Sequence, residues 1–230
     1  MKPAIDLRLM LVTDAAMAAR HGLMATVREA VAGGVTIVQL RDKDASDDDL
    51  IGLARALRAE LAPFRVPLIV NDRPWVAKAA NTDGAHVGQH DGDPRQARRL
   101  LGPDAIVGLS VTRASEVGTV DAGVVDYVGL GPVFASSTKA DAALPLGLDG
   151  LHEVGAMLPV PFVAIGGIDA GNAGAVIAAG AIGIAVVSAI CVAPDARAAA
   201  AVLRGAVDGQ GVSTREHDRD HHDAGSSSRV

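Results

Sequence analysis

The amino-acid sequence predicts a single-domain (β/α)₈ barrel, the α/β fold in which eight parallel strands alternate with helices. Short apolar segments recur eight times, and a segment with helical spacing of its apolar residues follows each of them. The apolar segments are continuous rather than alternating, which is typical of parallel strands covered on both faces. These units fill residues 1–208, a length at the compact end of the range for this barrel.

The predicted strands are rich in Val, Ile and Leu, as expected of a buried parallel sheet. They cover residues 8–13, 35–41, 67–71, 84–88, 105–110, 126–130, 161–166 and 183–188. The helical segments include LMATVREAVAGG, DDDLIGLARALRAELA and RASEVGTVDAG. Ser46 precedes the second of these as an N-cap, Asp93 followed by Pro94 begins another helix, and Gly34 and Gly123 are typical of helix ends.

An open, doubly wound sheet is the alternative arrangement of alternating strands and helices. Such a sheet normally carries a glycine-rich nucleotide-binding loop after its first strand. The corresponding segment here is VTDAAMAAR, which contains no glycine. The barrel is therefore the favoured fold.

Residues 209–230 differ in character from the rest of the chain. Their sequence, GQGVSTREHDRDHHDAGSSSRV, is polar and lacks apolar periodicity. Three histidines, His217, His221 and His222, stand among acidic residues and raise the alternative of a metal-binding tail. Charged, low-complexity composition of this kind predicts a disordered tail instead.

Composition argues against several classes of protein. The net charge is −6 and no basic block occurs, so nucleic-acid binding is not expected. No apolar stretch approaches the roughly 18 residues of a membrane span, and the N-terminal apolar run is too short for a signal peptide. The single cysteine, Cys191, excludes an internal disulfide and lies in the apolar context SAICVA, which predicts a structural thiol. We expect a cytoplasmic protein; its oligomeric state, a homo-oligomer included, is left open.

Barrels of this kind place function at the carboxyl ends of their strands. Gln39, Arg41 and Lys43 follow the second strand and share one face of the extended chain. Asp72 and Asp91 follow the third and fourth strands, so we expect them to be neighbours. Two carboxylates beside cations indicate Mg²⁺ shared with a polyphosphate. The alternative is a salt-bridge network that closes the rim of the barrel.

Two further features point to anions at the same end. Gly167, in the glycine pair after the seventh strand, and Ser188, after the eighth, are typical of a phosphate site built from backbone N–H groups. The sixth connection, residues 131–148, is long, carries Lys139 and is rich in hydroxyl groups. Its length predicts a mobile lid, although a surface insertion without function is the alternative.

A set of short motifs occurs in order, one in each of seven strand–helix units. They are QLRDK, VND, GAHVGQ-x-D, VGLS, DYVGLGPVF-x-S-x-TK, AIGGI and VVSAI. Over roughly residues 8–190 the chain thereby resembles the thiamine-phosphate synthase family. The resemblance implies a Mg²⁺-dependent transferase that joins 4-amino-2-methyl-5-(diphosphooxymethyl)pyrimidine to 4-methyl-5-(2-phosphooxyethyl)thiazole and releases pyrophosphate. It also implies a dissociative mechanism, in which pyrophosphate leaves before the thiazole nitrogen attacks.

The same resemblance implies roles for individual residues. The pyrimidine diphosphate would be held by Gln39, Leu40, Arg41, Asp42, Lys43, Asn71, Ser110 and Lys139, among which Arg41, Ser110 and Lys139 would take part in catalysis. Mg²⁺ would be held by Asp72 and Asp91. The thiazole phosphate would be held by Ser136, Ser137, Thr138, Gly167, Val187 and Ser188.

Departures from the family pattern are small. The first strand lacks an aromatic residue that is common in the family, Ser136 replaces a frequent threonine, and the histidine-bearing tail has no counterpart. Two other functions remain open: a thiazole tautomerase with the same barrel, and a barrel that binds a phosphorylated ligand without turnover. Retention of the residues assigned to the diphosphate and the metal, namely Arg41, Lys43, Asp72, Asp91 and Lys139, argues against the tautomerase.

Overall fold

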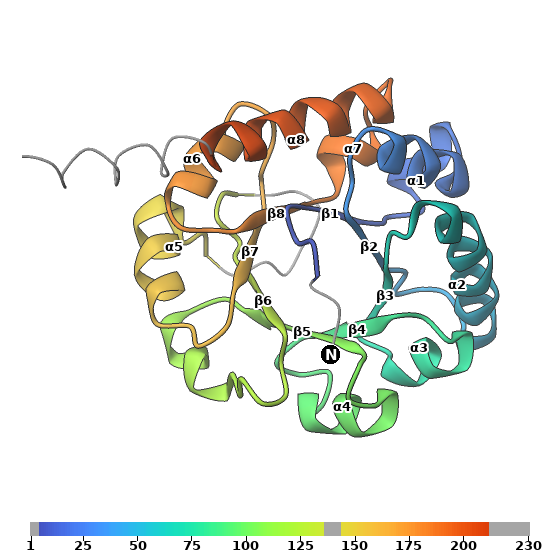
Figure 1. Ribbon diagram of the computed structural model, residues 1–230, viewed down its shortest axis with the longest axis horizontal. Helices are drawn as coiled ribbons and strands as arrows, with labels where there is room; N and C mark the ends of the chain where they lie inside the picture. Colours follow the sequence, from blue (N-terminus) through green and yellow to red (C-terminus); the bar gives the residue numbers. More distant parts are fainter. Residues whose placement is uncertain (1–4, 136–143, 212–230) are drawn as a thin grey trace, which may run out of the picture.

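The computed structural model describes residues 5–135 and 144–211 and consists of a closed, parallel, eight-stranded barrel (Figure 1). Neighbouring strands pair in sequence order, and β8 pairs with β1. The strands are β1 (Leu9–Val12), β2 (Ile37–Leu40), β3 (Leu68–Asn71), β4 (Gly84–Val87), β5 (Ile106–Val111), β6 (Tyr127–Leu130), β7 (Phe162–Ile165) and β8 (Gly183–Val186). The predicted barrel is confirmed, and each predicted strand end lies within two residues of the observed one.

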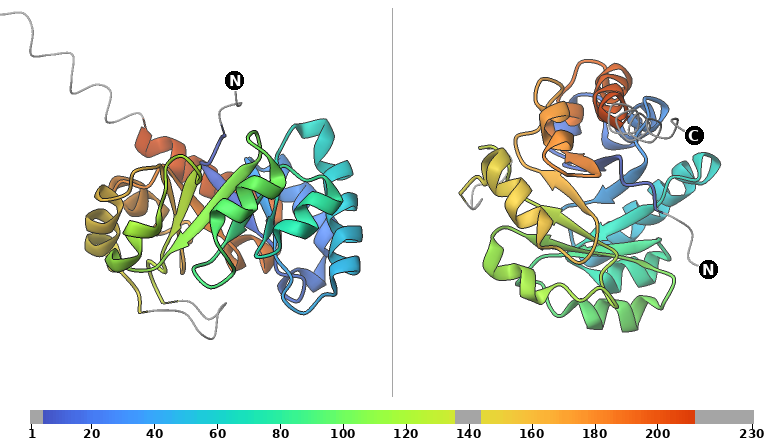
Figure 2. Two further views of the ribbon diagram at one scale, coloured as in Figure 1. Left: turned by 90° about the horizontal axis from the view of Figure 1, so that it is seen from below. Right: turned by 60° about the vertical axis from the view of Figure 1, so that its left-hand side comes forward.

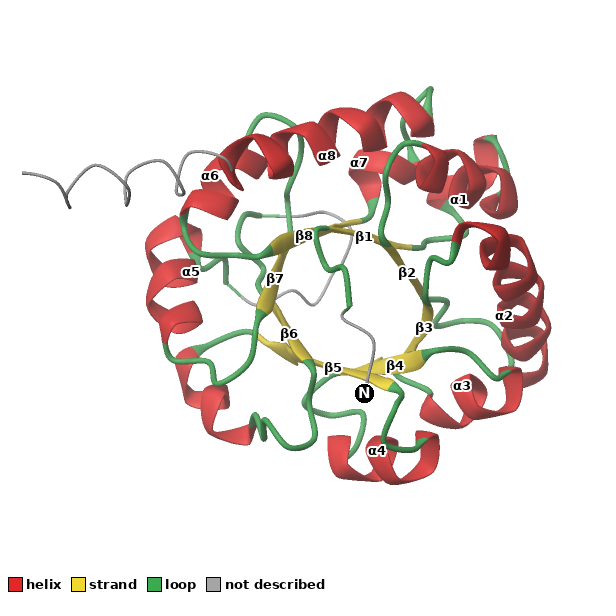
Figure 3. Ribbon diagram, viewed as in Figure 1, coloured by secondary structure: helices red, strands yellow, loops and turns green. Residues whose placement is uncertain are grey.

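Helices surround the barrel as an outer ring (Figure 3). They are α1 (Leu23–Ala32), α2 (Asp47–Leu61), α3 (Pro74–Ala80), α4 (Pro94–Leu101), α5 (Gly147–Ala156), α6 (Ala173–Ala178), α7 (Ser188–Cys191) and α8 (Ala196–Gly211), with 3₁₀ helices η1 (Met17–Arg20), η2 (Ala62–Phe64) and η3 (Ala114–Thr119). Two predicted caps are confirmed: the Ser46 Oγ accepts from the Asp49 amide at 3.2 Å, and the Asp93 carboxylate accepts from the Arg95 amide at 2.8 Å. Both side chains satisfy amide groups that the first helical turn leaves free.

The helix predicted from RASEVGTVDAG is wrong in type. The segment after β5 forms only the 3₁₀ helix η3. Gly118, Thr119 and Asp121 are poor helix formers and stand where a longer helix would continue. The Glu116 carboxylate also accepts from the amide of Thr112, which ties the segment into a short turn.

The C-terminal helix α8 continues to Gly211, three residues beyond the domain boundary placed after residue 208. Its C-terminal part lies at the same end of the barrel as the start of β1, where Arg8 and Asp208 pair at 3.2 Å (Figure 2). The remainder of the predicted tail, residues 212–230, lies outside the described residues. No helix in the described ranges is long and apolar enough to cross a membrane.

Two apolar clusters stabilise the fold. The larger one fills the space between the barrel and the helices, and the smaller one fills the barrel interior with residues such as Met10, Ile37 and Ile69. Two rings, His86 and Tyr127, also occupy the interior, with centroids 5.4 Å apart. Gly108 lies in register with both residues, and a Cβ at Gly108 would collide with both rings. Because Gly108 on β5 has no side chain, the rings of His86 on β4 and Tyr127 on β6 both fit into the barrel interior.

We predict that Gly108→Ala lowers the free energy of unfolding by roughly 1–3 kcal/mol, the usual cost of overpacking a core. Urea-induced unfolding measures this change. Gly52→Ala in helix α2 is the matched control, because an added methyl there meets nothing within 4 Å. The control should be neutral or should stabilise by roughly 0.5–1 kcal/mol. Equal stability of the two variants would contradict this account of the barrel interior.

Candidate active site

Three consecutive strands bring the predicted charged residues to one sector of the barrel mouth. Arg41 and Lys43 follow β2, Asp72 follows β3 and Asp91 follows β4. Because β2, β3 and β4 are parallel neighbours, their carboxyl ends meet at the same rim. The Asp91 carboxyl group lies within hydrogen-bonding distance of Asp72, and the charges of Lys43 and Arg41 act on Asp72 as well. The expected proximity of the two carboxylates is confirmed.

The ionisation of Asp72 is disfavoured at this place. The pKa of Asp72 is raised to about 6, chiefly because the side chain is partly buried and further because Asp91 is a hydrogen-bonding and negatively charged neighbour. Lys43 and Arg41 oppose this rise but do not cancel it. Among the ion pairs formed by described residues, none includes Asp72, Asp91, Arg41 or Lys43. The alternative of a rim closed by salt bridges between these groups is therefore not supported.

The backbone at Asp72 is strained in a way that directs its side chain. Its φ is +62°, in the left-handed region that a non-glycine residue adopts at some cost. Hydrogen bonds hold the turn: the Asp72 amide donates to the carbonyl of His86 at 2.8 Å, and the Arg73 amide donates to the carbonyl of Asn71 at 2.8 Å. Aspartate is one of the few non-glycine residues that tolerate this conformation, so it can occupy the sharp turn directly after β3.

The loop after β2 leaves only some of its predicted ligands facing the mouth. Leu40 is fully buried in the cluster between barrel and helices, so only its main chain could reach a ligand. The Arg41 amide donates to the hydroxyl of Thr13 at 3.0 Å, and Thr13 is completely buried. The Asp42 carboxylate accepts from the amides two and three residues further on, at 3.0 Å each. Asp42 therefore shapes the loop. Arg41 and Lys43 form no ion pair with any carboxylate of the described residues.

A column of polar groups lies beneath the mouth, inside the barrel. Gln39 is only 5% exposed and its amide donates to the Met10 sulfur at 3.6 Å, so it lies one layer below the cations. Burial raises the pKa of the Tyr127 phenol, and the neighbouring Gln39 side chain opposes that rise. His86 joins Tyr127 to Ser110: Nδ1 lies 2.8 Å from the Tyr127 hydroxyl and Nε2 lies 2.9 Å from the Ser110 hydroxyl. His86 is therefore a core residue whose two ring nitrogens both have hydrogen-bond partners.

Sequence reasoning assigned no role to Tyr127, although the strand register contains the signal. His86 pairs with Gly108, and Gly108 pairs with Tyr127, so all three residues face the barrel interior at one level. Asn71 is in register with His86 on the other side and therefore also faces inward. The strand register therefore shows that a glycine lies between two inward-facing rings, and this pattern cannot be recognised without it.

The glycine pair after β7 meets two structural demands. Gly166 and Gly167 have φ of +102° and +64°, and a Cβ at Gly167 would lie 2.6 Å from the carbonyl oxygen of Ala135. The segment before residue 136 thus packs directly on this turn, and the Phe134 amide donates to the carbonyl of Gly166 at 3.0 Å. Ser188 is exposed and begins the short helix α7.

The long connection after β6 is pinned at its base. The Leu146 amide donates to the carbonyl of Pro132 at 2.8 Å, and the Gly147 amide donates to the carbonyl of Val133 at 2.9 Å. Both flanks of the connection therefore start from one place beside the end of β7. The predicted ligands it carries, Ser136, Ser137, Thr138 and Lys139, lie outside the described residues.

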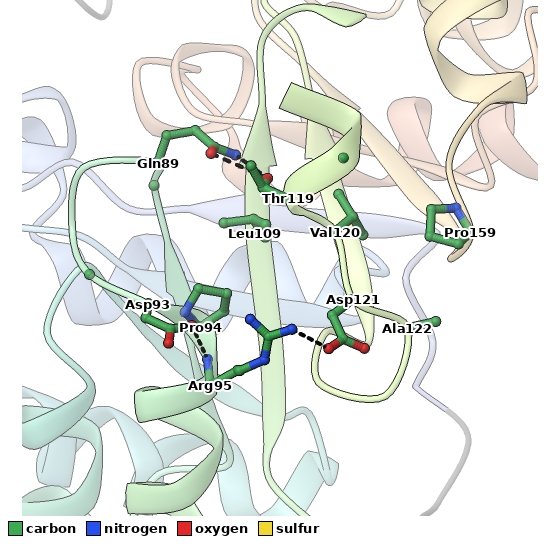
Figure 4. Close-up of a pocket in the computed structure, with 13 residues that line it drawn as sticks. Gln89, Asp93, Pro94, Arg95, Leu109, Thr119, Val120, Asp121, Ala122 and Pro159 are labelled. Carbon is green, nitrogen blue, oxygen red and sulfur yellow. Dashed lines mark hydrogen bonds and ion pairs between the residues drawn. The ribbon is translucent and has the colours of Figure 1, made fainter. Parts of the chain in front are cut away.

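A surface pocket of about 700 Å³ lies beside this site rather than in it (Figure 4). It opens between the start of α4 and η3, where Arg95 pairs with Asp121 at 2.7 Å and Gln89 bonds to Thr119 at 3.2 Å. Leu109, on the outer face of β5, contributes to the lining. The pocket is the gap left because a short 3₁₀ helix follows β5 where a full helix would give more cover.

Cys191 is a buried thiol at the end of α7. Burial raises its pKa to about 11, so the thiolate is not formed near neutral pH. The prediction of a structural thiol is confirmed.

The described residues contain no group of three or more His, Cys, Asp or Glu side chains that could hold a metal ion. A cation at the mouth would therefore take Asp72 and Asp91 from the described part of the protein and further oxygen atoms from ligand and water. A ligand set of one or two carboxylates, together with phosphate oxygens and water, is typical of Mg²⁺.

Comparison with known proteins shows close relatives. The family model described as thiamine monophosphate synthase matches residues 9–190. The thiamine-phosphate synthase of Azorhizobium caulinodans is 52% identical over 199 residues, which are 86% of this chain and 94% of the relative. That of Xanthobacter autotrophicus is 51% identical over 207 residues, covering 90% and 98% of the two chains. The thiamine phosphate pyrophosphorylase structure from Pyrococcus furiosus aligns with a TM-score of 0.81 and 33% identity, covering 90% of this chain and 98% of that one.

The buried column generates a prediction about acid stability. Burial lowers the pKa of His86 to about 4, although the charge of Asp91 acts in the opposite direction. In the unfolded chain a histidine titrates near about 6.5, so between these values only the unfolded state takes up the proton. Stability contributed by neutral His86 is therefore present above about pH 6.5 and is lost as the pH falls towards 4, by up to about 3 kcal/mol.

We predict that His86→Gln flattens this part of the stability curve, whatever its effect at neutral pH. Urea unfolding of wild type and variant between pH 4 and 7 measures the slope of the free energy of unfolding. Parallel curves for the two proteins would show that His86 does not titrate differently in the folded and unfolded states.

Proposed function

The chain belongs to the thiamine monophosphate synthase family, and from this premise we propose that it joins 4-amino-2-methyl-5-(diphosphooxymethyl)pyrimidine to 4-methyl-5-(2-phosphooxyethyl)thiazole. The products are thiamine phosphate and pyrophosphate. The observation that carries the proposal is the Asp72–Asp91 carboxyl pair, which stands beside Arg41 and Lys43 without forming ion pairs with them. Uncompensated charges of both signs at one rim suit a ligand that brings a cation and several anionic oxygens together.

Mg²⁺ is the metal we propose for this site, with Asp72 and Asp91 as its protein ligands. The raised pKa of Asp72 supports this fit, because a neighbouring cation removes the cost of holding two ionised carboxylates together. When bound, the ion supplies positive charge that stabilises the diphosphate as a leaving group.

The residues of this chain would divide the reaction between them. Arg41, Lys43 and Lys139 would bind the diphosphate oxygens. Asn71 on β3 and Ser110 on β5, the strands on either side of β4, would orient the pyrimidine above the buried column. The bond between the methylene carbon and the diphosphate oxygen breaks, and both electrons leave with pyrophosphate. The thiazole nitrogen then donates its lone pair to the resulting pyrimidinylmethyl cation. The cations stabilise the negative charge that grows on the leaving group.

The thiazole phosphate would bind on the opposite side of the mouth. Gly167 and Ser188 follow β7 and β8, and a short helix begins at Ser188, which is the arrangement that many barrels use for phosphate. Val187 lies just before that helix and contacts the barrel interior cluster, so its main chain rather than its side chain would face the phosphate. Hydroxyl groups of Ser136, Ser137 and Thr138 would complete the site.

An assay of the purified protein with both substrates and Mg²⁺ tests the proposed function. Pyrophosphate and thiamine phosphate should form in equal amounts, and omission of either substrate should abolish both. Binding of the pyrimidine diphosphate without turnover would identify a ligand-binding barrel. Conversion of the thiazole phosphate alone would identify a tautomerase.

The metal assignment predicts that Asp72→Asn and Asp91→Asn separate stability from activity. Asparagine keeps the shape, tolerates the left-handed backbone of residue 72 and removes one of two repelling charges, so metal-free melting temperatures should be unchanged or higher. Turnover should fall by roughly 100- to 1,000-fold, as when an electrostatic group of an active site is lost. The stabilisation by Mg²⁺ with the pyrimidine diphosphate should disappear.

Asp121→Asn is the control for this experiment, because it removes a carboxylate from an exposed ion pair away from the mouth. It should leave turnover and ligand-induced stabilisation intact. A destabilised Asp72→Asn protein that keeps the full ligand-induced rise in melting temperature would overturn the metal assignment.

A further inference from the structure

Arg73 follows Asp72 directly, yet its side chain reaches back to the preceding loop. Its Nη1 donates to the carbonyl of Ala45 at 2.7 Å, and its Nη2 donates to the carbonyl of Lys43 at 3.0 Å. The side chain is only 19% exposed. One guanidinium therefore spans two carbonyl groups of the segment that carries the mouth cations.

A second contact extends this connection to the helices. Arg73 Nη1 also lies 3.2 Å from a carboxylate oxygen of Asp47, the first residue of α2. The indole N–H of Trp75 donates to the other oxygen of the same carboxylate at 2.7 Å. Trp75 is 50% exposed, so this hydrogen bond rather than burial fixes its ring at the start of α3. The starts of α2 and α3 are thereby tied through one carboxylate.

We propose that Arg73 is a positioning residue, which holds the loop of Arg41 and Lys43 at a fixed place relative to Asp72. The inference rests on the proposed function, since it assumes that these three groups meet one Mg²⁺–diphosphate. Arg73 makes its contacts within the protein and acts on the substrate through the loop. The cations and the carboxylate then form a preformed unit, although they lie on separate strands.

Other contacts hold the loop only in part. The hydroxyl of Thr13 fixes its beginning at Arg41, and the carboxylate of Asp42 bonds to amides inside the loop itself. Of these, only the Arg73 contacts join the loop to the segment that carries Asp72. Without them, ordering of the loop must occur on ligand binding, and its cost appears as weaker binding.

The chemistry of the contact requires arginine. A guanidinium is planar and presents donors in a fixed fork, so it can hold two carbonyl oxygens at once. A lysine ammonium at the same position keeps the positive charge but lacks this geometry. Arg73→Lys therefore distinguishes a role in geometry from a role in charge.

The test measures steady-state kinetics and amide hydrogen exchange in Arg73→Lys. We expect KM for the pyrimidine diphosphate to rise roughly tenfold while kcat stays within about threefold, because the cost of ordering the loop falls on the binding step and the cations are in place once the substrate is bound. The amides of Asp44 and Ala45, which bond to the Asp42 carboxylate, should exchange faster. Arg95→Lys is the matched control, an identical change in an exposed ion pair, and should alter neither quantity.

A double-mutant cycle tests whether Arg73 acts through the loop. If Arg73 positions Lys43, the fold-increase in KM of the double variant Arg73→Lys, Lys43→Met should be smaller than the product of the two single fold-increases. Fully independent effects would overturn the proposal, as would wild-type KM and wild-type loop exchange in Arg73→Lys. The exchange measurement does not depend on the reaction. If the wild type releases no pyrophosphate but the loop amides of Arg73→Lys exchange faster, the proposed function is refuted and the positioning role of Arg73 stands.

Discussion

Closure of the eight-stranded sheet is the constraint on which the other features depend. Each strand sends alternate side chains into one narrow interior, so a large group on one strand requires a small group on its neighbour. His86 and Tyr127 enter the barrel on either side of Gly108, and together they leave a polar column in an otherwise apolar core. The column ends at the Ser110 hydroxyl near the mouth. Closure also fixes the order in which strand ends meet at the rim.

Electrostatics at that rim follows from the same strand order. Asp72 and Asp91 are 19 positions apart in the chain but neighbours in space, and partial burial together with the neighbouring Asp91 raises the pKa of Asp72. The loop of Arg41 and Lys43 supplies positive charge that opposes the rise in the pKa of Asp72 without cancelling it, and it forms no ion pair with Asp72 in the described structure. Neutralisation by direct pairing would stabilise the free protein and leave less charge for a ligand.

Much of this arrangement could be predicted from the sequence, because it depends on local patterns. Strand positions follow from apolar runs, and the adjacency of Asp72 and Asp91 follows from strand order in a parallel barrel. The helix after β5 could not be assigned correctly, since apolar spacing in RASEVGTVDAG competes with its glycines. The contacts of Arg73 and Tyr127 were also beyond prediction. They join residues about 30 to 40 positions apart, through side-chain directions that only the folded register defines.

Several unfavourable features occur together where β2, β3 and β4 end. Asp72 has a left-handed backbone, its carboxyl group faces a second one, and the neighbouring cations have no paired carboxylate in the described chain. Each feature costs stability in the free protein, and the barrel core and the Arg73 contacts must offset that cost. A ligand that brings a divalent cation and a diphosphate would relieve the carboxylate repulsion and pair the cations at once. On the proposed function, this strain is preorganisation: the protein would hold the charges in the arrangement that the bound state needs, and binding would not have to create it.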